Sequence, residues 1–106
     1  MNVLLKSPGK PATSQFLPHD DLHLYQQMVG GPIETVFLPR TQIVMICNEE
    51  GKLRGLQPNL PLYVGDELVD ILVGNIIFCR LKGEGFDGLR QSDIEILKER
   101  FPQLWQ

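Results

Sequence analysis

Apolar runs of strand length recur along the chain and are separated by turns rich in glycine, proline and polar residues. The first run, residues 2–6 (NVLLK), is a strand candidate that stops at a Ser-Pro-Gly sequence, because proline removes a backbone donor and glycine permits a turn. Residues 33–39 (IETVFLP) and 42–48 (QIVMICN) are rich in β-branched and aromatic side chains and predict a β-hairpin. Residues 75–82 (NIIFCRLK) predict the last strand.

The segment Ile43–Cys47 has no polar face. Uninterrupted apolar runs of this kind are typical of strands in the middle of a covered sheet, so we predict that Ile43–Cys47 is the central strand. The sequence NEEGK follows at once and predicts a tight turn, in which Asn48 bonds to nearby backbone and Gly51 adopts a positive φ.

Apolar residues at helical spacing predict a first helix over residues 20–29, which Asp20 caps and a Gly-Gly pair ends. Residues 7–19 before it form a loop or arm, within which residues 15–17 could pair as an edge strand. Residues 52–74 carry conflicting signals, because prolines and glycines interrupt the apolar residues. We expect an irregular, partly buried crossing there.

A second helix is predicted over residues 92–101, because Ser92 and Glu95 have the spacing of a capping box. The helix has an apolar face and ends at a proline. Leu104 and Trp105 then either dock as a tail or form an open contact surface.

Together these elements predict an α+β fold in which residues 1–106 form a single domain. A chain of 106 residues is large enough for one core, and 42% apolar with 22% charged residues is an ordinary globular composition. We expect a mostly antiparallel sheet of about four to five strands with two helices packed on one face.

The charge balance bears on partners and compartment. Ten basic and thirteen acidic residues give a formal charge of −3, so no overall field attracts a phosphate backbone and nucleic acid is not expected as a partner. The apolar stretch near the start is far shorter than a signal-peptide core or a membrane span. We therefore expect a cytoplasmic protein with no membrane association.

No motif in the chain predicts a cofactor or a metal. Cys47 and Cys79 lie inside apolar runs and are expected to be buried, reduced and inert. His19 and His23 are spaced like ligands on a helix face but lack a third ligand, so a solvated helix start is the better interpretation. The glycines of GEGFDG (residues 83–88) lack the helix and strand of a dinucleotide site and predict a hairpin-type loop instead.

Four polar residues near the predicted hairpin remain as candidates for binding a ligand or partner: Glu34, Asn48, Glu49 and Asn59. The competing interpretation is that Glu49 is an ordinary turn charge and that Glu34 pairs with Arg40, Lys52 or Arg54 for structural reasons. No catalytic residue is assigned, since the chain shows no activated nucleophile.

Three stretches, VGGPIETVFL, IVMICNEEGKLRGLQPN and DILVGNIIFCR, resemble a family of short phage, plasmid and mobile-element proteins that is known only as a domain of unknown function. The residues that carry the resemblance are a Val-Gly-Gly turn with a following glutamate, an Asn-Glu-x-Gly hairpin and a later asparagine: Val29, Gly30, Gly31, Glu34, Asn48, Glu49, Gly51 and Asn59. The resemblance implies a genomic setting and not a reaction.

From this setting we expect a non-enzymatic accessory binding protein that acts through a host or phage macromolecule. The alternative is a counter-defence protein that holds a nucleotide signal near Glu34 and the segment from Asn48 to Asn59. A small hydrolase that uses Glu34 with Glu49 is the least favoured. A homodimer is also expected, because apolar segments at the margins of so small a domain exceed what one core covers.

Overall fold

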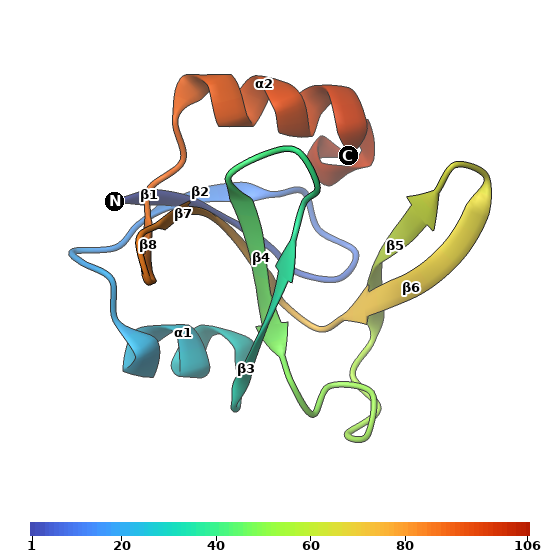
Figure 1. Ribbon diagram of the computed structural model, residues 1–106. Helices are drawn as coiled ribbons and strands as arrows, with labels where there is room; N and C mark the ends of the chain where they lie inside the picture. The colour runs from blue at the N-terminus through green and yellow to red at the C-terminus, as the bar shows by residue number, and fades with distance from the viewer.

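The computed structural model describes residues 1–106 and contains a six-stranded antiparallel sheet (Figure 1). Its strands run in the order β2-β1-β7-β4-β3, and the short β8 continues the β1 side of the sheet by pairing with the end of β7. Their bounds are β1 Asn2–Lys6, β2 Thr13–Phe16, β3 Ile33–Phe37, β4 Ile43–Asn48, β7 Ile76–Lys82 and β8 Gly85–Asp87. The expected edge strand is confirmed as β2, and residues 83–88 do form a hairpin, with β8 as its second strand.

The predicted central strand is confirmed. Every residue of β4 is buried, and β4 lies between β3 and β7, with Ile46 opposite Ile77. β3 forms the predicted hairpin with β4, and its register places Glu34 opposite Cys47 and Val36 opposite Met45. Because the side chains of a strand alternate between faces, these two pairs share one face of the sheet.

The α+β class is confirmed, but the two helices cover opposite faces of the sheet, so their placement on one face was wrong (Figure 1). Helix α1 (Leu22–Val29) buries Tyr25 and Val29 on the face that carries Val44 and Ile77. Helix α2 (Gln91–Arg100) buries Leu97 on the other face, with Met45 and Phe78. The physical reason is that β4 is apolar on both faces, so both need a cover.

Both helices begin at residues other than the predicted caps. The N-cap of α1 is Asp21, whose carboxylate accepts from the N–H groups of His23 and Leu24. Asp20, the predicted cap, instead accepts from the Tyr25 hydroxyl at 2.6 Å and from the Phe86 N–H, which joins α1 to β8.

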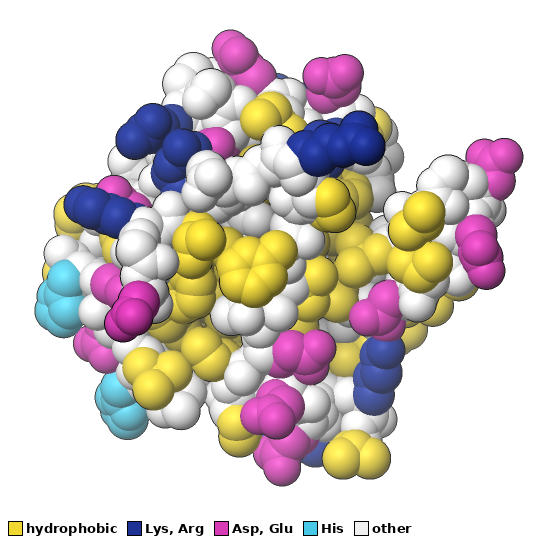
Figure 2. All heavy atoms as spheres, in the orientation of Figure 1, with side chains coloured by type: hydrophobic (Ala, Val, Ile, Leu, Met, Phe, Trp, Pro, Cys, Tyr) yellow, Lys and Arg dark blue, Asp and Glu magenta, His cyan; other side chains and the backbone are white.

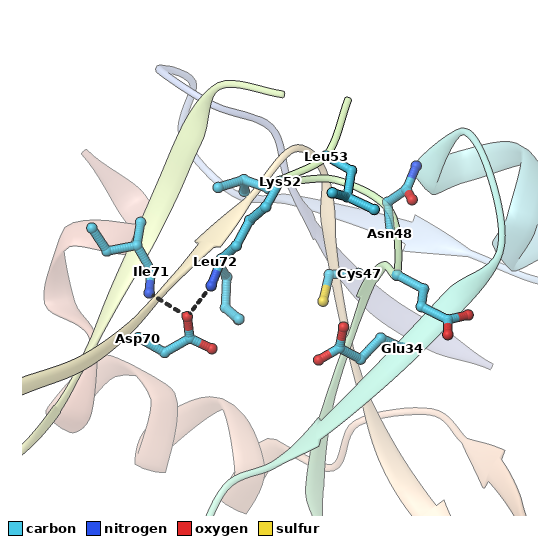
Figure 3. A pocket seen from close by; sticks show the side chains of 10 residues that line it. Glu34, Cys47, Asn48, Lys52, Leu53, Asp70, Ile71 and Leu72 are labelled. Atoms are coloured by element: carbon cyan, nitrogen blue, oxygen red, sulfur yellow. Dashed lines mark hydrogen bonds and ion pairs between the residues drawn. The ribbon is translucent and has the colours of Figure 1, made fainter. Parts of the chain in front are cut away.

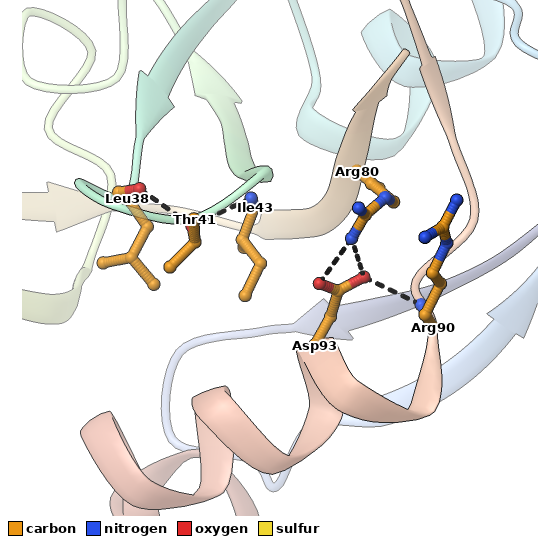
Figure 4. A network of polar contacts seen from close by, with 6 residues as sticks. All are labelled: Leu38, Thr41, Ile43, Arg80, Arg90 and Asp93. Atoms are coloured by element: carbon orange, nitrogen blue, oxygen red, sulfur yellow. Dashed lines mark hydrogen bonds and ion pairs between the residues drawn. The ribbon is translucent and has the colours of Figure 1, made fainter.

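The predicted capping box of Ser92 with Glu95 is also wrong, because the N-cap of α2 is Arg90 and Asp93, three residues later, accepts from its N–H (Figure 4). The Asp93 carboxylate accepts from the N–H of Arg90 at 2.9 Å and from the Arg80 guanidinium at 2.8 and 3.0 Å. This buried ion pair attaches the start of α2 to β7. After α2, the short helix η1 (Pro102–Trp105) turns Leu104 into the core.

Residues 52–74 are more regular than expected. Strands β5 (Pro58–Val64) and β6 (Glu67–Val73) form a separate two-stranded antiparallel hairpin, which extends away from the body of the molecule (Figure 1). Its root is packed into the core through Leu60 and Leu72. The register shifts twice, at Asn59 and at Val69, where one strand carries an extra residue. Such bulges bend and twist a hairpin, so the β5–β6 hairpin is a regular element despite its prolines.

Candidate functional site

A small hollow lies between the β3–β4 hairpin and the root of β6 (Figure 3). Its volume is about 90 Å³. We call it the acidic hollow. Ten residues line it: Glu34, Cys47, Asn48, Glu49, Lys52, Leu53, Asp70, Ile71, Leu72 and Val73. Three of the four predicted binding residues, Glu34, Asn48 and Glu49, therefore meet in one place.

Strand register explains why these residues converge. Glu34 on β3 stands opposite Cys47 on β4, and Asp70 reaches the same space from β6. Figure 3 shows Glu34 and the Cys47 sulfur on one side of the hollow and Asp70 with Lys52 on the other. The hollow thus joins three segments that are distant in sequence.

The turn after β4 delivers Glu49 and Lys52 to the hollow. Asn48 bonds to nearby backbone as predicted, since its side-chain oxygen accepts from the Glu50 N–H at 2.8 Å. Gly51 does not have the predicted positive φ. It is glycine for a different reason: a Cβ there would lie 2.8 Å from Val73 Cγ2, so the turn packs directly against β6.

Three carboxylates and one ammonium group line the acidic hollow. Lys52 forms an ion pair with Asp70, and this hydrogen bond lowers the pKa of the Asp70 carboxyl and raises that of the Lys52 ammonium. No ion pair joins Glu34 to Arg40, Lys52 or Arg54, so the predicted structural pairing is wrong. Arg54 instead donates to the Gly30 carbonyl at 2.7 Å. Glu34 and Glu49 remain exposed acceptors.

Cys47 is the one thiol that lines the hollow. Burial, with smaller contributions from the negative charges of Glu34 and Asp70, raises the pKa of its thiol to about 11. Burial likewise raises the pKa of Cys79 to about 12. Since the thiolate is the reactive form, both cysteines are protonated at neutral pH, as the prediction of inert thiols requires.

The other predicted contact residues lie elsewhere. Asn59, at the first bulge of the β5–β6 hairpin, donates to the carbonyls of Lys6 at 2.9 Å and Gly74 at 2.7 Å, so it holds the hairpin root against β1. Leu104 is fully buried and is not an open contact surface, because η1 docks it under α2. Trp105 is half-buried with the Lys98 ammonium 5.9 Å from its ring centre.

A second, apolar depression follows the acidic hollow along β3 and β4. We call it the apolar groove; its volume is about 220 Å³ and its principal lining residues are Val36, Phe37, Leu38, Tyr63, Val64 and Phe101. Figure 2 shows the β5–β6 hairpin standing off the body, with hydrophobic side chains along the furrow between them. One face of the molecule therefore carries an acidic and an apolar depression side by side.

A comparison with protein families matches residues 1–102 to a domain of unknown function, DUF3846. The chain belongs to this family. The expected relationship to a family of unknown function is thereby confirmed, and the match includes the acidic hollow and the β5–β6 hairpin. Neither the search of curated proteins nor that of solved structures finds a match.

The DUF3846 chain holds no group of three or more His, Cys, Asp and Glu side chains arranged to bind a metal. None of its helices is long and apolar enough to cross a membrane. Sequence reasoning missed Asp70 and the exposed Leu53 as residues of the hollow. Asp70 could have been found, because it is the one charge within the apolar run LVDILV.

Proposed function

We propose that this DUF3846 protein is a non-enzymatic accessory binding protein, and that its acidic hollow accepts a cationic side chain of a protein partner. The motif resemblance supports a phage or mobile-element setting, in which the protein would act in the host cytoplasm. The observation that carries the proposal is the lining of the hollow, where Glu34, Glu49 and Asp70 face a single ammonium group.

Charge and shape favour a cation from a protein. Opposite charges within a few ångströms attract, and carboxylates accept the paired N–H groups of arginine. The long apolar stem of an arginine or lysine would meet Ile71 and Leu53, and the Leu53 side chain is 91% exposed beside the hollow. An exposed leucine at the rim also offers a partner an apolar contact.

The same charges weigh against the nucleotide alternative at this position, because phosphate would face three carboxylates. Covalent chemistry is disfavoured too, since the Cys47 thiol keeps its proton at neutral pH. Glu34 and Glu49 are both exposed to solvent, so their environments do not divide the acid and base roles that a hydrolase needs.

The test uses small probes that carry one side chain each. We would titrate the protein with N-acetyl-arginine methylamide, the lysine and glutamine analogues, and ATP, and follow backbone amide shifts by NMR. The arginine and lysine probes should shift the amides of Glu34, Cys47 and Asp70, and the glutamine probe and ATP should not.

Matched variants localise the effect. Glu34→Gln and Asp70→Asn should each weaken binding of the arginine probe about tenfold, as expected for loss of a charged hydrogen bond. Glu84→Gln removes an exposed carboxylate in the β7–β8 turn and should leave binding unchanged. The proposal fails if ATP binds at the hollow. It also fails if the arginine probe binds Glu34→Gln and Asp70→Asn as tightly as it binds wild type.

A further inference from the structure

The outer part of the β5–β6 hairpin exposes apolar side chains that nothing else in the chain covers. Tyr63, Val64 and Val69 are exposed to 59, 69 and 54%. A two-stranded hairpin alone is at best marginally stable in water, and a contiguous apolar surface of this kind marks a contact site. This end of the hairpin therefore lacks a cover.

The apolar groove beside the hairpin has the matching character. Phe37 on its wall is 56% exposed, and β3 is the last strand of the sheet, so its outer backbone edge is unpaired. The groove opens into a wider hollow of about 450 Å³ that Arg100 lines together with Tyr63 and Val64. Tyr63, Val64 and Val69 of the hairpin form one wall of the groove, so the hairpin and the body of the chain enclose an apolar furrow that is open to solvent.

The charges around these two surfaces are opposite in sign. The hairpin tip carries the exposed carboxylates of Asp66 and Glu67 (Figure 2). Two exposed arginines flank Pro39, which lines the groove: Arg40 follows it in the β3–β4 turn, and Arg100, at the end of α2, donates to the Pro39 carbonyl at 3.0 Å. None of the four forms an ion pair within the chain.

We propose that the hairpin and the groove form an interface with a second copy of this chain, related by a two-fold axis. The hairpin of each protomer covers the apolar groove of the other, and its acidic tip meets the other's Arg40 and Arg100. Such an interface requires one patch that is complementary to itself, and a chain that carries both an apolar hairpin with an acidic tip and an apolar groove with a basic rim meets this requirement. The acidic hollow at the hairpin root is a separate site, so this inference goes beyond the proposed function.

The first test is the mass of the full chain in solution, measured by sedimentation equilibrium over a range of concentrations. Wild type should show a monomer–dimer equilibrium. Val64→Lys places a charge in the apolar contact and should raise the dimer dissociation constant at least about 30-fold, the effect of losing a central contact residue. Phe16→Lys is the matched control, because Phe16 is 72% exposed on β2 at the opposite edge of the sheet.

The second test exchanges charges between protomers. One variant carries Asp66→Lys with Glu67→Lys, and the other carries Arg40→Glu with Arg100→Glu. Each alone should be monomeric, because tip and rim then repel. An equal mixture should form a heterodimer, in which both tip–rim contacts are again between opposite charges.

Circular dichroism of each variant checks that it is folded, and all substituted side chains are exposed in the monomer. A wild type that stays monomeric up to about 1 mM, a concentration at which even a weak specific dimer forms, overturns the proposal. So does a dimer that Val64→Lys leaves intact, or a mixture of the two charge variants that stays monomeric.

Discussion

Strands β4 and β6 both consist mostly of apolar residues, but β4 is buried and most of β6 is exposed. β4 (IVMICN) is buried along its whole length between two strands and two helices. β6 (ELVDILV) is nearly as apolar, yet Leu68 and Val69 are exposed and only Leu72, at the root, is buried. β6 has one neighbouring strand, and β4 has two.

An apolar run therefore predicts that a strand will be covered, but it does not predict which element covers it. For β4 the cover comes from α1 and α2 of the same chain. For the outer part of β6 no cover exists within the chain, and this is why we assign it to contact with a second copy. Substitutions in the two regions should therefore affect different quantities: the free energy of unfolding in one and association in the other.

The largest loss of stability should follow Asp93→Ala. The change leaves the Arg80 guanidinium without its carboxylate partner beneath α2 and removes the acceptor for the N–H of the N-cap residue, Arg90. Breaking a buried pair on one side costs about 3–5 kcal/mol, to be measured by urea unfolding. Asp66→Ala at the hairpin tip, measured at protein concentrations where the chain is monomeric, is the control and should change the free energy of unfolding by less than about 0.5 kcal/mol. A small effect of Asp93→Ala would mean that the pair contributes nothing to joining α2 to the sheet.

Next in size is Ile46→Ala in β4. Ile46 is fully buried on the α1 face, and truncating a core isoleucine costs about 2–5 kcal/mol because a cavity remains. The free energy of unfolding from urea titration measures it. A loss below about 0.5 kcal/mol, typical of surface positions, would remove the contrast between β4 and β6.

Alkaline pH should weaken the core through its thiols. Folding raises the pKa of Cys47 to about 11 and of Cys79 to about 12, from an ordinary value of 9.0. Between these values the unfolded chain loses protons that the folded chain retains, so stability is full below pH 9 and falls as the pH rises through 11 to 12. Urea midpoints from pH 7 to pH 11 measure this decline.

The matched variant for the pH effect is Cys47→Ala with Cys79→Ala, in which the decline with pH should be shallower. Some decline should remain, because burial and the Asp20 hydrogen bond raise the pKa of the Tyr25 hydroxyl in the same direction. An equally steep decline in this variant would assign the alkaline sensitivity to groups other than the thiols.

The smallest effect on stability should come from Val64→Ala, measured at protein concentrations where the chain is monomeric. Because Val64 is largely exposed, the free energy of unfolding should change by less than about 0.5 kcal/mol. Dimerisation should weaken in the same variant. A stability loss as large as that of Ile46→Ala would show that the hairpin belongs to the monomer's core.

The sequence predicted those parts of the fold that depend on local pattern. The run Ile43–Cys47 located the central strand because a short run of β-branched and other apolar residues, ended by a turn sequence, is typical of a strand covered on both faces. Helix caps were less predictable, since Asp20 and Asp21 are equally suitable by type, and only the tertiary contact of Asp20 with Tyr25 selects Asp21. The faces that α1 and α2 cover follow from chain connectivity in space, which periodicity does not encode.

The acidic hollow was partly predictable for a similar reason. Glu34, Asn48 and Glu49 lie on one hairpin, so their proximity followed once that hairpin was assigned. Asp70 comes from the β5–β6 hairpin, whose prolines suggested irregular structure. The bulge at Asn59 allows Pro58 to stand within a regular hairpin, and the same bulge turns Asn59 toward Lys6 and away from the hollow.

The position of the β5–β6 hairpin in the chain also has a consequence for folding kinetics. β4 and β7 are neighbours in the sheet, yet the entire hairpin lies between them in sequence. Pairing Ile46 with Ile77 must close this long loop, whose entropic cost grows with its length. A hairpin forms within about 1–10 μs, and it brings Pro58 opposite Val73. If the hairpin forms first, the loop that remains to be closed is much shorter, so an element that is largely exposed accelerates assembly of the most buried strand.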